Sequence, residues 1–485
     1  MVNLYREVGI ELAPKNFDVE TSVAIIGGGG CGLTAGIVSA QNGAETIIFE
    51  RDIRLSGSTG MSYGSVCAAG TKLQEREGVL DSVDDLVEDI LEATQGQTDP
   101  DHVRAMAKNA RDALNWITED LRLDFSIEKN WTGYGHRIPR LHGTPLRSGE
   151  EMIAMLASAA SDAGATLVMQ ADVSKIFINE NGLPCGLKYC SPDGELTVSA
   201  QAIIIASSGF AANSNIVKDM IPEIQNATYY GAEWHQGDAL AWANHLEIEL
   251  ADLGSYQSLG NLAIPHNIVV PHTVLIDGGF AVNNAGFRFH NELENISGQA
   301  LTILDQPNEF CWLIYDQQGH NKANDLFEEY RRGIEVKAYK SADTIEALAD
   351  KLKIPVSEFS ATFKAINDLV NAEAIDNFGR KFEKSSKLTP PYYAVKVTGA
   401  LFHTQGGICV DESARVQKTD GTTIPNLFAG GGAIRGVSGP GEWGYLPGMG
   451  LCTAIAFGWR AGIEAASMIK SNKICPKGLI HDVTP

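Results

Sequence analysis

Excess positive charge is missing from this chain of 485 residues, in which 60 acidic side chains outnumber 38 basic ones and give a formal net charge of −22. Nucleic acids and anionic membrane surfaces are bound through patches of Lys and Arg, so this balance argues against both partners. No apolar run reaches the length that spans a bilayer. The first twenty residues lack an apolar core and a small-residue cleavage site, and we therefore expect no secretory leader.

Cysteines with metal-site spacing are also absent. The closest two, Cys185 and Cys190, form neither a CxxC pair nor a set that nearby histidines complete into a zinc site. The scattered pattern predicts free thiols, no metal site and a cytoplasmic protein, because the cytoplasm keeps thiols reduced. The other six cysteines are Cys31, Cys67, Cys311, Cys409, Cys452 and Cys475.

Glycine, by contrast, is plentiful, and four glycines in a row stand near the start of the chain. They follow the apolar run Ser22–Ile26, which predicts a buried strand. Residues 30–41 then predict a helix and residues 46–49 a second strand. The order strand, glycine turn, helix and strand is typical of a nucleotide-binding unit.

The glycine motif between that strand and helix suits a pyrophosphate. Gly27 allows a tight turn, Gly29 lets backbone amides approach the ligand, and Gly32 lets helix and strand pack closely. Gly30 opens the helix, whose N-terminus favours negative charge. Glu50 ends the next strand, where a carboxylate accepts hydrogen bonds from ribose hydroxyls. Together these residues predict a bound dinucleotide.

Two further segments favour FAD over NAD. Residues 56–64 are mostly Gly and Ser, which lets an extended ligand pass close to the backbone. Residues 426–436 and 444–462 repeat the strand–glycine–helix device, and that helix N-terminus can face the N1/O2 edge of a flavin. A nicotinamide enzyme needs no such return of the chain. The other predicted FAD contacts are Arg51, Ser58, Thr59, Gly60, Ser62, Gly64, Val173, Ala206, Ser207, Gly209, Asp238, Gly431, Gly448, Gly450 and Leu451.

The remaining pattern predicts an α/β protein. Ser82 with Asp85 and Ser148 with Glu151 are capping boxes that open two helices. The apolar period changes to two over residues 165–189, which predicts strands around an Asn-Gly turn. Further predicted elements are a helix at 101–121, strands at 202–209, 265–289 and 311–316, helices at 344–353 and 357–372, strands at 406–411 and 426–432, and a last helix at about 450–470.

This organisation predicts one nucleotide-binding domain assembled from both ends of the chain, with a second domain inserted in its middle. The fold expected is a Rossmann-like FAD-binding domain with an inserted α+β capping domain. Its predicted parts are residues 1–250 and 391–485 for the FAD-binding domain and residues 251–390 for the capping domain.

Several stretches together resemble the flavoprotein superfamily of fumarate reductases, succinate dehydrogenase flavoprotein subunits and 3-ketosteroid dehydrogenases. The resemblance implies FAD, a two-part FAD domain, an inserted cap, and a substrate held between cap and flavin. Covalent flavin linkage in that superfamily uses an early histidine; residues 56–65 contain none, so we expect non-covalent FAD. The stretches are the N-terminal fingerprint, GSTGMSYGSVCAAG (57–70), GGFAVNNAGFRFHNE (278–292), TIEALADKLKIPVSEFSATFKAIN (344–367), HTQGGICVDESARV (403–416) and IPNLFAGGG (424–432).

The chain departs from the fumarate reductases at two positions. Their proton-donating arginine follows a tag like residues 289–292, and an ungapped count places Ile296 there. A second arginine of the family falls near residues 444–448, where this chain has Tyr445. Because a desolvated carboxylate without a cationic partner is costly, these changes argue against a dicarboxylate substrate.

Tyrosine in that last loop resembles the ketosteroid dehydrogenase branch, where a tyrosine works on the ketone side of the substrate. Tyr445 is thus a candidate donor to a developing enolate oxygen. It can serve as a base only if its pKa lies well below the free value of about 10. The structural alternative is a packing residue in a Gly/Pro loop.

Other polar residues are weaker candidates for the site. His403, before TQGG, matches a substrate-facing histidine of the fumarate reductases, and His272 falls near another such position. Tyr63 lies in the glycine segment and can face the flavin. Arg140 and His142 precede a capped helix and can anchor a substrate carboxylate, as can Arg435. For each of them a purely structural role is the alternative.

The sequence therefore predicts an FAD-dependent oxidoreductase acting on a CH–CH bond next to a ketone. Its substrate would be a cyclic ketone or enone, such as a ketosteroid or an oxo-cyclohexane carboxylate. No second dinucleotide fingerprint is visible, so an external electron acceptor is expected. The alternatives are a reductase of an unsaturated carboxylate and a non-catalytic flavin electron-transfer subunit; an elaborate inserted domain argues against the latter.

Overall fold

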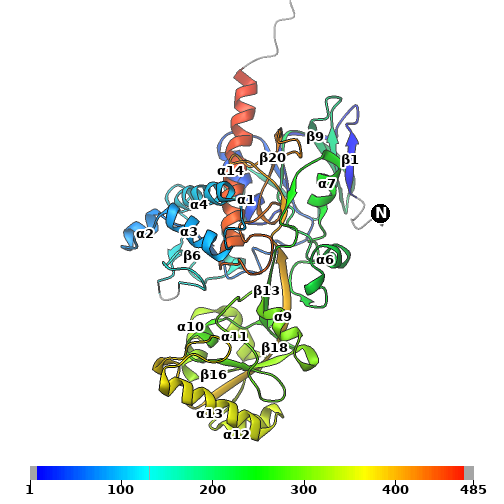
Figure 1. The fold of residues 1–485 in the computed structure, drawn as a ribbon. Helices are drawn as coiled ribbons and strands as arrows, with labels where there is room; N and C mark the ends of the chain where they lie inside the picture. The colour runs from blue at the N-terminus through cyan, green and yellow to red at the C-terminus, as the bar shows by residue number, and fades with distance from the viewer. Residues whose placement is uncertain (1–7, 130–131, 475–485) are drawn as a thin grey trace, which may run out of the picture.

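The computed structural model describes residues 8–129 and 132–474, which form two lobes joined by long strands (Figure 1). One lobe contains the segments near both ends of the chain, and the other is built from its middle. Residues 1–7, Cys475 and the following ten residues lie outside the described part. The mixed α/β fold predicted from the sequence is confirmed.

A nine-stranded sheet forms the centre of the first lobe. Its order is β1-β8-β9-β10-β2-β3-β7, with β21 pairing with β10 and β20 with β21. The apolar core of this lobe covers β2, whose last six residues are buried. β2 pairs in parallel with both β3 and β10, as a nucleotide-binding unit requires. The strands are β1 (Gly9–Leu12), β2 (Val19–Ile26), β3 (Thr46–Phe49), β7 (Thr166–Val168), β8 (Asp172–Ile178), β9 (Pro184–Ser191), β10 (Gly194–Ile205), β20 (Arg415–Gln417) and β21 (Thr423–Ala429).

Two helices far apart in sequence cross each other against this sheet. They are α1 (Gly30–Gln41) and α14 (Met449–Ile474), blue and red in Figure 1. A Cβ at Gly458 would collide with the Cys31 carbonyl, so glycine permits the close crossing. The first and last helices are thereby held in one lobe, as the sequence predicts.

Two helices of this lobe, α3 (Val83–Ala93) and α5 (Gly149–Asp162), begin where the capping boxes were predicted. Ser82 caps α3, because its hydroxyl accepts from the Asp85 amide at 3.1 Å. The Ser82 amide donates to Asp81 and not to Asp85, so only half of the first predicted box is present. Ser148 precedes α5 without a side-chain cap. The carboxylate of Glu151 instead accepts from the Leu146 amide, so the second predicted box is wrong. The other helices here are α2 (Lys72–Arg76), α4 (Pro100–Glu119), α6 (Ser214–Met220) and α7 (Asp238–Leu246).

A seven-stranded sheet forms the second lobe, in the order β14-β13-β18-β16-β15, with β11 and β17 also paired to β18. β18 lies after the predicted boundary at 390 and β11 before the one at 251, so this sheet crosses both. The strands are β11 (Thr228–Tyr229), β13 (Tyr256–Ala263), β14 (Ile268–Val269), β15 (Phe280–Val282), β16 (Cys311–Asp316), β17 (Lys340–Ala342) and β18 (Tyr392–Thr404).

Short helices cover this second sheet. The predicted strand at 311–316 and the two predicted helices are found as β16, α12 and α13. The helices are α8 (Thr273–Ile276), α9 (Gln299–Leu304), α10 (Gln317–Leu326), α11 (Glu328–Glu335), α12 (Ile345–Leu352) and α13 (Val356–Ala372). Small sheets are formed by β12 (Leu250–Ala251) with β19 (Gly407–Ile408), and by β4 (Ser65–Cys67), β5 (Ser126–Ile127) and β6 (Leu141–Gly143).

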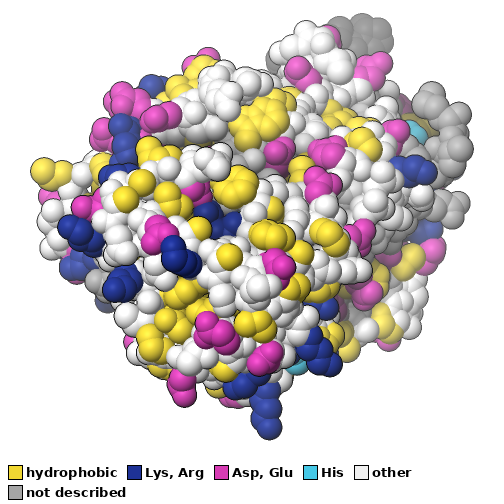
Figure 2. All heavy atoms as spheres, turned by 60° about the horizontal axis from the view of Figure 1, so that its bottom comes forward, with side chains coloured by type: hydrophobic (Ala, Val, Ile, Leu, Met, Phe, Trp, Pro, Cys, Tyr) yellow, Lys and Arg dark blue, Asp and Glu magenta, His cyan; other side chains and the backbone are white. Residues whose placement is uncertain are grey.

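Charged side chains of both signs share the surface. On the face shown in Figure 2, Lys and Arg side chains are interspersed with Asp and Glu. Across residues 8–129 and 132–474 no helix is long and apolar enough to cross a bilayer. The seven described cysteines are free thiols.

Candidate active site

One continuous cavity runs between the lobes, and the glycine turn forms one end of it. Gly27 has φ +111°, and a Cβ there would collide with the Ala206 carbonyl. Gly32 lies behind the lining, where a Cβ would strike the Gly27 carbonyl. Gly29 and Gly30 line the cavity at the N-terminus of α1. The turn therefore offers bare backbone and a helix N-terminus to a ligand phosphate.

Glu50 lines the same end of the cavity. Its carboxylate accepts from the amides of Gly28 at 2.7 Å and Asp52 at 2.8 Å, which fix its orientation. Burial raises the pKa of this carboxyl, while the two amide bonds oppose the rise. Arg51 also lines the cavity, but its guanidinium is paired with Asp172 and Asp238. Of the predicted contacts, Asp238 is thus placed behind Arg51 rather than on the lining.

The glycine- and serine-rich segment and the C-terminal return form the walls of this end. Thr59 accepts from the Gly30 amide at 3.1 Å, which ties the two segments together. Gly431 (φ +64°) and Gly448 (φ +83°) bring the returning chain against the cavity. The predicted contacts found on the lining here are Ser58, Thr59, Ser62, Val173, Ala206, Ser207, Gly431, Gly448, Gly450 and Leu451.

Three further predicted FAD contacts, all glycines, lie off the lining at close contacts between chain segments. A Cβ at Gly60 would lie 2.9 Å from the Leu55 carbonyl, and one at Gly64 would lie 2.6 Å from the Ser148 carbonyl. A Cβ at Gly209 would collide with the Thr404 hydroxyl. These glycines let neighbouring chain segments approach each other.

The residues present fit FAD. The cavity offers bare glycine backbone, the N-termini of α1 and α14, and the Glu50 carboxylate. The hydroxyl of Ser207, buried on the lining, has no hydrogen-bond partner within the protein, as a ligand-facing group would. Glu50 would hold the ribose, the α1 N-terminus the pyrophosphate, and the α14 N-terminus the flavin.

Replacing Glu50 by Ala is expected to weaken FAD binding by about 10- to 100-fold, because a charge-assisted hydrogen bond to the ribose is lost. Fluorescence titration of the apoprotein with FAD measures the change. Glu45→Ala, an exposed residue before the same strand, is the matched control and should bind as the wild type. Equal affinity of both variants would remove Glu50 from the cofactor site.

A second polar group lies farther along the cavity, where Tyr445, Gln257 and His403 come together. His403 Nε2 is 2.5 Å from Gln257 Oε1, and Gln257 also hydrogen-bonds Tyr445. Burial raises the pKa of Tyr445, with the Gln257 contact opposing it. Burial lowers the pKa of His403. At neutral pH this wall is an uncharged set of hydrogen-bonding groups in which Tyr445 keeps its proton.

Two further predicted substrate-side residues, Tyr63 and His272, also line this cavity. Tyr63 donates to the Val269 carbonyl at 3.4 Å and contacts the ring of Phe327, with ring centroids 4.8 Å apart. His272 has its pKa lowered to about 4 by burial, so its imidazole is neutral. Ile296, the residue counted at the arginine position, is also on the lining.

Cationic side chains are scarce on the cavity wall. Among its described lining residues Arg51 is the single Arg or Lys, and it is paired with two carboxylates. Arg288 and Arg380 lie off the lining, and both are tied to buried Glu292 at 2.7 Å. The described wall therefore presents no free guanidinium to a substrate.

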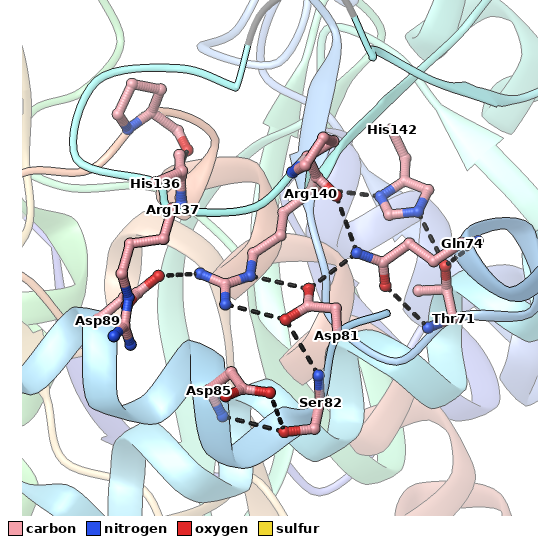
Figure 3. A network of polar contacts seen from close by, with 12 residues as sticks. Thr71, Gln74, Asp81, Ser82, Asp85, Asp89, His136, Arg137, Arg140 and His142 are labelled. Carbon is pink, nitrogen blue, oxygen red and sulfur yellow. Dashed lines mark hydrogen bonds and ion pairs between the residues drawn. The ribbon is translucent and has the colours of Figure 1, made fainter. Parts of the chain in front are cut away.

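Figure 3 shows where Arg140 and His142 lie. The Arg140 guanidinium is fully buried and paired with Asp81 and Asp89. His142 lies 2.9 Å from the Thr71 hydroxyl and 2.8 Å from the Arg140 carbonyl, and burial lowers its pKa to about 4. Both side chains are off the cavity lining. They do not fit the predicted role of substrate anchors, because their polar atoms are already satisfied inside the lobe.

Arg435 is occupied in a similar way. Its guanidinium is paired with Asp252 at 2.7 Å and Asp99 at 3.1 Å, off the cavity lining.

Three lining residues were not predicted from the sequence, namely Gln257, Tyr230 and Glu329. Glutamine, tyrosine and glutamate in strand and helix patterns carry no motif, so only the fold brings them to the cavity.

Residues 22–445 match the family described as FAD binding domain, and the chain belongs to that family. The protein is an FAD-dependent oxidoreductase that acts on CH–CH or C=C bonds. The family resemblance and the FAD predicted from the sequence are confirmed.

Individual relatives carry different activities. The chain is 27% identical over 450 residues to a probable fumarate reductase (Ifc3) of Shewanella frigidimarina, covering 92% of this chain and 75% of that protein. The open conformation of a flavocytochrome c3 fumarate reductase matches with TM-score 0.79 at 27% identity, covering 93% and 79% of the two chains. A 3-ketosteroid-Δ4-(5α)-dehydrogenase from Rhodococcus jostii RHA1, bound to 4-androstene-3,17-dione, matches with TM-score 0.72 at 21% identity, covering 93% and 98%.

Proposed function

We propose that this protein desaturates the C–C bond next to the carbonyl of a cyclic ketone, or reduces the corresponding enone. The observation that carries this proposal is the cavity wall: an uncharged Tyr445–Gln257–His403 group, with Ile296 on the lining and no unpaired Arg or Lys among the described lining residues. A ketone needs hydrogen-bond donors, whereas a dicarboxylate needs cations to offset its desolvation. The wall supplies the first and not the second.

In this reaction the Tyr445 hydroxyl donates a hydrogen bond to the ketone oxygen and keeps its proton. Gln257 hydrogen-bonds both the Tyr445 phenol and the neutral His403 ring, so the donor is oriented before the substrate arrives. Negative charge develops on the ketone oxygen as the neighbouring carbon loses a proton, and a preoriented donor stabilises that charge. The raised pKa of Tyr445 makes it a donor at neutral pH and opposes a role as tyrosinate base. Bound FAD supplies the acceptor for the hydride.

The direct test mixes the oxidised protein with saturated cyclic ketones under nitrogen. We expect one or more 3-ketosteroids or oxo-cyclohexane carboxylates to bleach the flavin absorbance. We further propose that an external acceptor, rather than NAD(P)H, exchanges electrons with the reduced protein. Fumarate and urocanate serve as the controls in the reverse direction.

The outcome separates this proposal from reduction of unsaturated acids. Relatives of that type are named fumarate and urocanate reductases. If the reduced flavin is reoxidised rapidly by fumarate or urocanate and not by cyclic enones, the proposal of a ketone substrate is wrong, whereas the assignment of the FAD site is unaffected. If cyclic ketones bleach the flavin, a carrier without turnover is excluded as well.

A further inference from the structure

One carboxyl group on the cavity wall, that of Glu329, has no role in the proposed binding of the ketone oxygen. Glu329 lines the cavity from α11, in the second lobe. Its Oε1 accepts from the Tyr230 hydroxyl at 3.1 Å and from the Val269 amide at 2.8 Å. Two donors therefore fix this carboxyl, and β14 and the residue after β11 supply them.

The groups around Glu329 are mostly phenols. Burial and the negative charge of Glu329 raise the pKa of Tyr63, in the glycine segment, and of Tyr339, beyond α11. Tyr230 hydrogen-bonds the same carboxylate. Arg332, one turn along the same helix, is the cation that faces it, but that guanidinium is ion-paired to Glu328 at 2.9 Å. Glu329 thus sits on the lining without a direct ion pair of its own among the described residues.

Tyr63 connects this carboxyl to the ketone-binding wall. Besides burial, electrostatic interactions with Glu329 and with Tyr445 both raise the pKa of the Tyr63 phenol, and all three residues line the cavity. The glycine turn and the N-terminus of α14 belong to the first lobe, whereas α11 belongs to the second. A substrate between the lobes would have the FAD-binding residues on one side and Glu329 on the side of the second lobe.

Glu329 is a carboxyl on the lining that can exchange a proton with a substrate. Burial raises the pKa of its carboxyl above the ordinary range. Burial moves the pKa of Tyr230 and of Tyr445 upwards, farther from neutrality, and lowers that of His272 to about 4. An efficient base has a pKa near the working pH. Glu50, the other buried carboxyl here, is committed to the ribose end.

We propose, resting on the ketone chemistry above, that Glu329 is the catalytic base that takes the proton from the carbon next to the ketone. The C–H bond at that carbon breaks, its electron pair forms the new C=C bond, and the neighbouring carbon loses a hydride to FAD. The proton moves to the Glu329 carboxylate, and two electrons reduce the flavin. In the enone-reducing direction the same carboxyl returns the proton. Tyr230 acts as a positioning residue that holds Oε1.

The experiment uses the FAD-loaded protein and a cyclic ketone already found to bleach the wild-type flavin, so the ketone proposal has passed its own test beforehand. Stopped-flow absorbance measures flavin reduction under nitrogen across pH. Glu329→Gln keeps the shape and an acceptor for both donors, and should slow reduction by about 10²- to 10⁴-fold. Glu335→Gln, an exposed residue at the end of the same helix, is the matched control and should react as the wild type.

Two further readouts separate proton transfer from a structural role. The wild-type rate should rise with pH as the carboxyl ionises, and this rise should vanish in Glu329→Gln. Glu329→Ala leaves room for a small carboxylate, so added acetate should restore part of the lost rate. A wild-type rate in Glu329→Gln, or an unchanged pH profile, would overturn the assignment. Should Glu329→Gln fail to retain FAD, Glu329→Ala with and without acetate decides: rescue supports the base and no rescue overturns it.

Discussion

Tyr445→Phe should slow flavin reduction by a cyclic ketone by about 10²- to 10³-fold, the loss that follows removal of one preoriented oxyanion donor. The ring would remain in place, because burial and its neighbours hold it, and only the hydroxyl would be lost. FAD should stay bound, since the ribose and pyrophosphate contacts lie at the other end of the cavity. Stopped-flow absorbance under nitrogen measures the rate, and the flavin spectrum reports cofactor content.

The control for this substitution is Tyr189→Phe. Tyr189 lies in β9 against the ring of Phe49, off the cavity lining, so its hydroxyl plays no part in the proposed chemistry. It should reduce flavin as the wild type does. A Tyr445→Phe rate near that of Tyr189→Phe would make Tyr445 a packing residue, and the ketone oxygen would need another donor.

The uncharged wall suits a substrate whose charge appears only during the reaction. A neutral ketone enters without a desolvation cost that cations must offset, and its oxygen meets a fixed phenol as negative charge develops. A permanent cation would also hold an anionic substrate in the ground state. In the proposed reaction the Tyr445–Gln257–His403 group would therefore bind the transition state more tightly than the ground state.

The FAD half of the molecule was predictable because its constraints are local. A glycine turn followed by a helix and an acid after the next strand specifies backbone geometry within thirty residues, and Gly27, Gly29 and Glu50 lie where expected. The final helix was predictable for the same reason. Gly60, Gly64 and Gly209, which were predicted as FAD contacts, lie off the cavity lining at close contacts between chain segments that no local pattern reveals.

The substrate half depends on long-range pairing. Gln257 meets His403 because β13 and β18 run antiparallel with these residues opposite each other, 146 positions apart in sequence. The second sheet crosses one predicted domain boundary through β18 and the other through β11, which pairs with β18. Glu329 reaches the cavity only through the fold of the second lobe. Composition and motif spacing do not predict such pairings between distant residues.

Arg140→Met should lower the free energy of unfolding by about 3–5 kcal/mol, the usual cost of breaking a buried ion pair from one side. The Arg140 side chain is 0% exposed, and the carboxylates that it pairs, Asp81 and Asp89, are 0% and 1% exposed. Removing the guanidinium leaves two buried negative charges. Asp81 would keep neutral hydrogen bonds from Gln74 and Ser82, which do not balance its charge.

Arg137→Met is the matched control, because Arg137 pairs with the same Asp89 from a position that is 54% exposed. Exposed pairs contribute about 0–1 kcal/mol, so this variant should unfold close to the wild type. Urea unfolding at equilibrium measures both. The comparison also tests the anchoring role expected from the sequence. If Arg140→Met were as stable as Arg137→Met and instead raised KM for a carboxylate-bearing ketone, Arg140 would belong to the substrate site. We expect loss of stability with KM unchanged in the folded fraction, since the buried pair lies off the cavity lining.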